Sequence, residues 1–284
     1  MRVKDTFLNP FTDFGFKKLF GTEPNKDLLL DFLNELFRKD EGEIRDITFL
    51  SKEQLGRTID DRKAIFDLYC ESERGDKFIV ELQKAKQNYF KDRSIYYSTF
   101  PIQSQAEKGD WNFQLTSVYT VGILDFIFED NKNDKEVFHH EVQLFDKNTQ
   151  KVFYDKLTYI YLEMPKFTKT LDELETHFDK WLFVIQNLKN LTDRPLKFQE
   201  RIFNKLFDQA ELANFDEQEY LEYEESLKAY RDLKNSIDTA REEGREEGEK
   251  KKALEVAKKG KKKGYSVQDI SEMTGLSVDE IEKL

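Results

Sequence analysis

The stretch IFDLYCESERGDKFIVELQ, residues 65–83, decides the fold because it predicts two strands joined by a tight turn. Successive side chains of a strand point to opposite faces. Glu81 and Gln83 in the second strand therefore share one face. The apolar residues around them take the opposite face, which we expect to face the core: Phe78, Val80 and Leu82.

Asp67 lies within the first of these two strands. If the turn brings Asp67 alongside Glu81, two carboxylates meet, and like charges at short range raise each other's pKa unless a cation neutralises them. Oxygen ligands suit a hard divalent ion such as Mg²⁺. A hairpin with one solvated face shows the same alternation, and Glu141 and Gln143 repeat the spacing. The stretch alone leaves a metal site and a solvated sheet face both open.

Segments on either side of the hairpin indicate a family. The chain opens with NPFTDFGFKKLFG (residues 9–21) and NKDLLLDFLNE (25–35). Asp67, VELQ (80–83), FKDRSIYY (90–97) and an apolar strand at 118–128 follow. The tail contains AREEGREEG (240–248) and GYSVQDI (264–270). In this order and spacing, the chain resembles the Rpn family of recombination-promoting nucleases and transposases in the PD-(D/E)XK nuclease superfamily. The resemblance spans almost the whole chain.

The resemblance implies an α/β fold, with a restriction-endonuclease-like mixed sheet flanked by helices and a helical C-terminal extension. Helical periodicity after Pro165 agrees with the extension. We therefore expect a nuclease-like core at residues 1–165 and a helical extension at 166–249. A basic helix with a helix-turn-helix-like tail should follow at 250–284.

The resemblance also implies roles for the polar residues. Asp67 and Glu81 would hold Mg²⁺, for which Mn²⁺ can substitute, and Gln83 stands where the superfamily usually carries a catalytic Lys. A Gln can orient a water through its amide oxygen but brings no charge, which puts the strength of catalysis in doubt. Lys63 or Arg93 could supply the missing positive charge. Glu35 would be an auxiliary acid of the metal site, or an ordinary surface residue.

A local basic run follows the hairpin and predicts contact with nucleic acid. The candidate residues are Lys84, Lys86, Arg93, Tyr96, Tyr97 and Gln103. Aromatic side chains stack on bases, but the two tyrosines could equally pack in the core. Lys84 should point to the face opposite Gln83 and should not replace the missing catalytic Lys. Asp13 is either a helix N-cap or a further site residue.

Composition narrows the class of protein. The chain has 284 residues and a formal net charge of −11, which argues against bulk non-specific binding of nucleic acid but leaves room for a local basic groove. The single cysteine, Cys70, excludes an intrachain disulfide and should fill the core beside Phe66 and Leu68. No apolar run is long enough to span a membrane, and the N-terminus carries no apolar signal segment. We therefore expect a cytoplasmic protein.

The C-terminal part predicts self-association. Ala240, Gly244 and Gly248 recur every fourth residue, and small residues on one helical stripe let two helices approach closely, although a solvated helix is the alternative. Ser266 and Ser277 should cap two short helices in a helix-turn-helix-like tail. Acidic residues in the last helix oppose DNA reading there, which favours a packing or protein-contact motif.

These inferences predict a Mg²⁺-dependent endonuclease, a phosphodiester hydrolase. Its substrate should be nucleic acid, DNA rather than RNA, and the family's name implies recombination or transposition. Two alternatives stay open. One is a catalytically weak or inactive module of the same fold that binds nucleic acid or regulates, which the absent Lys favours. The other is an RNA-cleaving defence protein.

Overall fold

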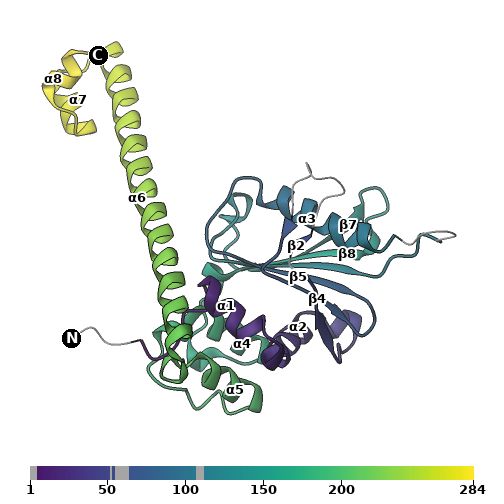
Figure 1. The fold of residues 1–284 in the computed structure, drawn as a ribbon. Coiled ribbons are helices and arrows are strands. Elements are labelled where there is room, and N and C mark those ends of the chain that lie inside the picture. Colours follow the sequence, from purple (N-terminus) through teal and green to yellow (C-terminus); the bar gives the residue numbers. More distant parts are fainter. Residues whose placement is uncertain (1–4, 52, 55–63, 107–111) are drawn as a thin grey trace. The chain divides into compact units, whose positions relative to one another are not determined.

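The computed structural model describes residues 5–51, 53–54, 64–106 and 112–284. The chain folds as two compact units, residues 1–230 and 231–284. The first unit is built on a mixed sheet with helices on both faces, and the second unit is helical (Figure 1). The predicted fold class is therefore confirmed. The predicted three-part division of the chain stays a prediction.

The sheet has six strands and both strand directions. Its strands lie in the order β1 (Ile47–Phe49), β4 (Leu68–Ser72), β5 (Lys77–Gln83), β6 (Val118–Leu124), β8 (Lys151–Glu163) and β7 (His139–Asp146). The three central neighbours β5, β6 and β8 run parallel, and the outer strands pair antiparallel. The carboxyl ends of the parallel strands therefore meet at one edge, where ligands of open α/β sheets bind. A separate pair consists of β2 (Glu53–Gln54) and β3 (Ala64–Ile65).

Helices cover the two faces of the sheet unequally. One face carries α1 (Asp13–Phe20), α2 (Lys26–Glu41), α4 (His177–Asn187) and α5 (Arg201–Ala210). The other face carries α3 (Phe90–Ser104). Short 3₁₀ turns connect these elements at Glu23–Asn25, Glu129–Asn131, Met164–Lys166, Leu171–Glu173, Leu188–Asn190 and Leu212–Asn214. The main hydrophobic core lies on the first face. Helix α3 covers the other face, on which the candidate site lies.

Aromatic side chains dominate the main core. Trp181 is fully buried, and its ring centroid lies 5.7 Å from that of Phe20 and 5.2 Å from that of Phe203. The apolar residues of β5 join this core as predicted: Phe78, Val80 and Leu82. Helices from residues 177–210 therefore pack in the same core as the N-terminal helices, which joins distant parts of the chain in one unit.

The first strand of the predicted hairpin is interrupted at Asp67. The chain bends there, and β4 begins only at Leu68. Cys70 is buried with Leu68 in the main core, but Phe66 packs with Tyr69 on the α3 face. The expectation that Phe66 and Cys70 share one face was therefore wrong, because the bend shifts the strand alternation.

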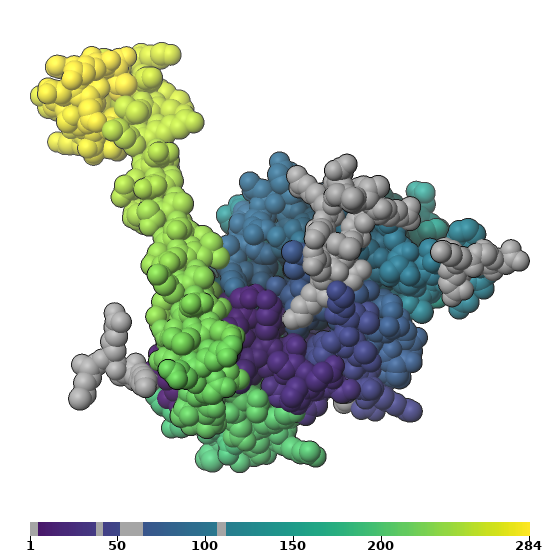
Figure 2. Space-filling model, viewed as in Figure 1, coloured from purple at the N-terminus to yellow at the C-terminus, as the bar shows by residue number. Residues whose placement is uncertain are grey.

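The first turns of α6 (Glu217–Lys262) pack beside α1, and this contact lies within the first unit (Figures 1 and 2). The Phe14 N–H donates to Ser226 Oγ at 3.0 Å, and Lys18 forms an ion pair with Glu219. The acidic start of α6 thus lies against the N-terminal helix.

The second unit comprises the rest of α6 with α7 (Val267–Thr274) and α8 (Val278–Glu282). Ala257, Ile270 and Ile281 form its small core. Ser266 and Ser277 cap α7 and α8, as predicted. Among the described residues, no helix combines the length and apolarity needed to cross a membrane.

Candidate active site

The two predicted acids lie opposite each other where the β4–β5 ladder ends, and the carboxylate of each accepts a hydrogen bond from a backbone N–H of the other segment. Leu68 pairs with Val80, so Asp67 lies opposite Glu81 at the end of the β4–β5 ladder. The Asp67 N–H donates to Glu81 Oε1 at 3.2 Å, and the Leu82 N–H donates to Asp67 Oδ2 at 2.8 Å. These two bonds replace the regular ladder where the chain bends, and they lock the two carboxylates in place.

Burial and mutual repulsion disfavour the ionised forms of Asp67 and Glu81. Glu81 is only 9% exposed. Burial, followed by the charge of Asp67, raises the pKa of Glu81 to about 8. Burial also raises the pKa of Asp67. Near neutral pH the pair therefore retains a proton unless a cation binds it.

The chemistry of the pair fits a divalent cation. Among the described residues, no three His, Cys, Asp or Glu side chains cluster as ligands would. Mg²⁺ nevertheless needs only one or two carboxylates, with water and substrate phosphate completing its shell. A buried and a half-buried carboxylate that repel each other provide that donor set. Asp67 and Glu81 are thus the residues that would hold such an ion.

Gln83 holds the positively charged side chain of Arg93 on the sheet face that carries Glu81. The side chain is 8% exposed, its Nε2 donates to Ala85 O at 2.8 Å, and its Oε1 accepts a hydrogen bond from Arg93 Nη2. The Arg93 guanidinium also lies 5.7 Å from the centroid of the Tyr97 ring. Its charge lowers the pKa of Glu81, although burial has the larger, opposite effect. Gln83 therefore positions Arg93 beside Asp67 and Glu81, which we call the acid pair.

A second group of charges approaches from α1. Thr12 is the N-cap of this helix, because its side chain accepts from the Gly15 N–H. Asp13 is therefore not the cap; it forms an ion pair with Lys17 at 2.7 Å. Burial lowers the pKa of Lys84, whereas the charges of Asp13 and Asp67 raise it. The charges of Asp13, Lys17 and Lys84 thus lie near enough to Asp67 to change its pKa.

Comparison with known proteins identifies the family to which this chain belongs. A profile of the family described as PD-(D/E)XK nuclease family transposase matches residues 10–240. The chain belongs to this family. No curated protein and no solved structure matches it. Membership gives the chain a nuclease or transposase-related role and a nucleic-acid substrate, and nucleases of this superfamily generally use divalent metal ions. The sheet described above is thus a restriction-endonuclease-like core.

The structure brings only some predicted residues of this PD-(D/E)XK protein to the acid pair. Tyr97 joins it, half-buried against Phe66 with ring centroids 5.4 Å apart, and the charge of Glu81 helps raise its pKa after the larger effect of burial. Tyr96 is exposed and packs edge-on against Phe100. Lys86 forms an ion pair with Glu129.

Two other predicted residues, Glu35 and Gln103, lie elsewhere. Glu35, on α2, lies near His177, whose pKa is raised chiefly by its hydrogen bond to Asp31 and further by the Glu35 charge. Gln103 is exposed near the end of α3. Lys63 lies outside the described residues. The described contacts therefore place neither Glu35 nor Gln103 at the acid pair.

Sequence reasoning missed the contribution of Lys17. Its charge lowers the pKa of Asp67 and adds to the lowering of the Lys84 pKa, so it lies close to both. The available signal was the spacing of Asp13 and Lys17 by four residues, which predicts an ion pair on one face of a helix. Nothing local in the sequence indicated that this face would meet the β4–β5 hairpin.

Proposed function

We propose that this protein is an endonuclease that hydrolyses phosphodiester bonds in DNA with Mg²⁺ or Mn²⁺ held by Asp67 and Glu81. The observation that carries the proposal is the pair of crossed backbone hydrogen bonds that holds the half-buried carboxylate of Asp67 beside the buried carboxylate of Glu81. The family's description as a transposase supports DNA over RNA and a role in recombination or transposition.

The residues around the pair have complementary tasks in this reaction. A bound divalent ion polarises the phosphate and lowers the pKa of its water. Gln83 Oε1 already accepts from Arg93, and its second lone pair can orient the attacking water. The Arg93 guanidinium offsets negative charge that develops on the phosphate in the transition state. Arg93 therefore takes the electrostatic part of the Lys that the superfamily usually carries.

Cleavage of supercoiled plasmid and of single-stranded RNA, each with Mg²⁺, Mn²⁺ or EDTA, tests this function. The enzymes compared are wild type, Glu81→Gln, and Glu141→Gln as the matched control. Glu141 belongs to the second Glu-x-Gln of the chain and is exposed on β7. We expect wild type and the control to cut plasmid only with metal. Equal rates for Glu81→Gln and wild type would contradict the site, and preferential cutting of RNA would contradict the substrate.

Replacing Arg93 with Ala should lower the cleavage rate about a hundredfold, the usual effect of removing one preorganised donor. The pH at which cleavage is half-maximal should also rise, because the charge that lowers the pKa of Glu81 is lost. Arg93→Lys should recover part of the rate. Arg74→Ala, at the turn of the same hairpin, is the control and should cut like wild type. An unshifted pH profile in Arg93→Ala would show that Arg93 does not act on the pair.

We further propose that two copies associate through the stripe of Ala240, Gly244 and Gly248. A Cβ atom added at Gly244 or Gly248 would meet nothing within 4 Å, so packing within the described chain does not require these glycines. The variant Gly244→Leu with Gly248→Leu should keep the helix, since Leu is the better helix former, and should be monomeric in light scattering. A wild type that is already monomeric at micromolar concentration would refute the association.

A further inference from the structure

A cavity of about 430 Å³ lies between α3 and the β7–β8 hairpin. Its walls combine apolar, aromatic and polar side chains, among them Ile95, Phe128, Tyr159, His140 and Gln143. Its volume lies within the range of small-molecule sites, which are mostly apolar with a few placed polar groups. The cavity is separate from the acid pair, and the proposed reaction does not use it.

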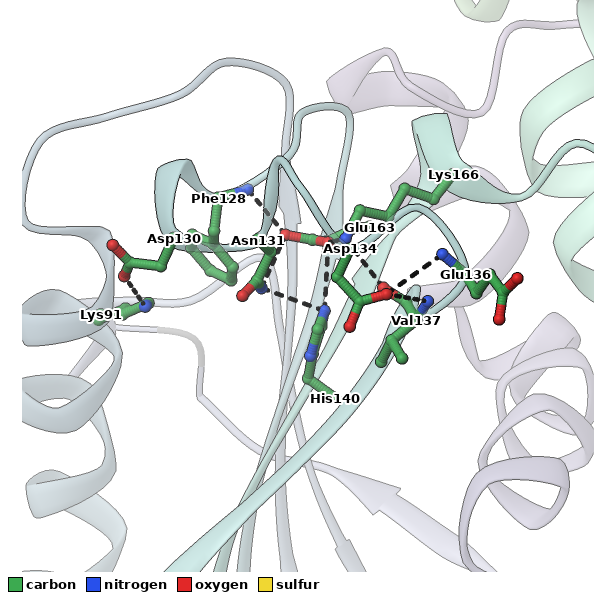
Figure 3. Close-up of polar contacts among 10 residues, drawn as sticks. All are labelled: Lys91, Phe128, Asp130, Asn131, Asp134, Glu136, Val137, His140, Glu163 and Lys166. Carbon is green, nitrogen blue, oxygen red and sulfur yellow. Dashed lines mark hydrogen bonds and ion pairs between the residues drawn. The ribbon is translucent and has the colours of Figure 1, made fainter.

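Hydrogen bonds fix the polar groups of this cavity (Figure 3). Glu163 is fully buried and accepts from the Phe128 N–H at 2.7 Å and from Asn131 Nδ2 at 3.2 Å. His140 Nε2 lies 3.1 Å from Glu163 Oε2. Burial alone would raise the pKa of Glu163, but its hydrogen bonds, the strongest from Lys166, keep it below the usual value. Because the carboxylate is ionised, His140 donates to it.

These bonds leave two acceptors at the cavity. In the imidazole tautomer that donates from Nε2 to Glu163, the other ring nitrogen of His140, Nδ1, is an acceptor. Gln143 Nε2 donates to Thr158 Oγ1 at 2.9 Å, which leaves its Oε1 able to accept. Tyr159 and Tyr161 stack nearly parallel in the same wall, with an angle of 15° between their rings. Two acceptors beside aromatic walls suit a flat heterocycle with an exocyclic amino group.

The cavity and the acid pair lie in one row across the sheet. Glu81 pairs with Gly122, Gly122 with Tyr161, and Tyr161 with His140. Neighbouring strands are about 4.8 Å apart, so Glu81 and His140 are separated by about 14 Å. Both are on the sheet face that α3 covers. Arg93 and Tyr97 line the side of α3 toward Glu81, and Ile95 lines the side toward the cavity.

A polar surface connects the two around the start of α3. A second, smaller pocket there includes Lys86, Tyr89 and Lys91, and it shares Lys91 and Phe128 with the cavity. Its two lysines form ion pairs with Glu129 and Asp130, which line the same pocket. Tyr89 is 80% exposed. The N-terminus of a helix attracts phosphate, and α3 begins at this surface. A strand whose scissile phosphate lies at Glu81 could therefore pass over the start of α3 toward the cavity.

We propose that this cavity receives one unpaired, amino-bearing base of the bound nucleic-acid strand, a few nucleotides from the scissile phosphate. The inference rests on the proposed function, which places that phosphate at Asp67 and Glu81. The base stacks against the aromatic wall, His140 and Gln143 accept from its amino group, and Lys91 faces the adjoining backbone. The site thereby fixes which phosphate reaches the acid pair.

Filling the cavity tests the proposal. Val142 lines it and is 46% exposed, so Val142→Trp should fold and block it. Val152, 51% exposed on the neighbouring strand and outside the cavity, provides the matched control Val152→Trp. The probe is a set of single-stranded oligonucleotides, each with 2-aminopurine at one position, bound to proteins that also carry Glu81→Gln. We expect one position to change fluorescence in the Val152→Trp protein and not in Val142→Trp, with affinity about tenfold lower in the latter.

The outcomes separate this site from the proposed reaction, because binding is measured without cleavage. A position-dependent signal that Val142→Trp abolishes supports the cavity even if wild type cuts no substrate. Equal signals and affinities in the two tryptophan variants overturn it even if wild type cuts DNA. Absence of binding by either protein also overturns it. Displacement of the oligonucleotide by equimolar deoxyadenosine monophosphate would identify a free nucleotide, not a strand, as the ligand and would overturn it too.

Discussion

The Glu81→Gln protein is expected to cut DNA at least about a thousandfold more slowly than wild type, while its metal-free form gains stability at alkaline pH. The loss of rate follows because the amide cannot bring the negative charge that holds a divalent ion, and the ion supplies both the activated water and the charge stabilisation. The gain in stability follows because Gln has nearly the shape of Glu and removes a buried charge that Asp67 repels.

The sign of the pH dependence follows from the direction of the shift. The pKa of Glu81 rises from an ordinary 4.5 to about 8 on folding, so the folded state binds the proton more tightly than the unfolded state. The resulting stabilisation is complete below pH 4.5 and is lost as the pH rises through 8. A shift of this size corresponds to roughly 5 kcal/mol in the free energy of unfolding. The pKa of Asp67 shifts in the same direction, so it adds to the slope.

Thermal unfolding in EDTA at pH 5, 7 and 9 measures this slope. Wild type should lose stability across the series, and Glu81→Gln should lose clearly less. Mg²⁺ or Mn²⁺ should restore wild type at pH 9 and leave Glu81→Gln unchanged. The Glu141→Gln control should follow wild type throughout. Parallel curves for Glu81→Gln and wild type would show that Glu81 does not carry the buried charge.

The hairpin was predictable because its information is local. Alternation over β5 places Glu81 and Gln83 on one face and the apolar residues on the other, and the structure confirms this. The bend at Asp67 was not predictable, because it arises from bonds that Leu82 and Glu81 make across the strand pair. Alternation read through that bend therefore misplaced Phe66.

The surroundings of the site depended on contacts between distant segments. Lys17 meets the hairpin only because α1 docks on the core, and no periodicity within α1 specifies its partner. The role of Gln83 also depends on a distant segment. Its spacing from Glu81 indicated an amide beside the acids, but the hydrogen bond from Arg93 requires α3 to cross the strand. No local pattern in the sequence marked Glu163. Its buried network requires β7, β8 and the turn at 129–131 to converge.

Breaking that network should have the second largest effect. Glu163→Gln is expected to lower the free energy of unfolding by about 3–5 kcal/mol, the usual cost of leaving one partner of a buried ion pair without the other. Lys166 Nζ lies 2.6 Å from Glu163 Oε2, and the Lys166 side chain is only 4% exposed. Its charge would therefore remain buried opposite a neutral amide. Urea denaturation measures the change directly.

Two comparisons separate the buried charge from mere loss of packing. Adding Lys166→Met to Glu163→Gln should recover much of the lost stability, because no unpaired charge then remains and an apolar side chain fills the space. Glu129→Gln, which breaks the ion pairs of Glu129 with Lys86 and Lys132 at the exposed surface, should change stability little. If Glu163→Gln were no more harmful than Glu129→Gln, the carboxylate would not be the anchor of β7 and β8. His140 would then lack the fixed orientation on which the base site depends, because Glu163 is the group that holds its ring.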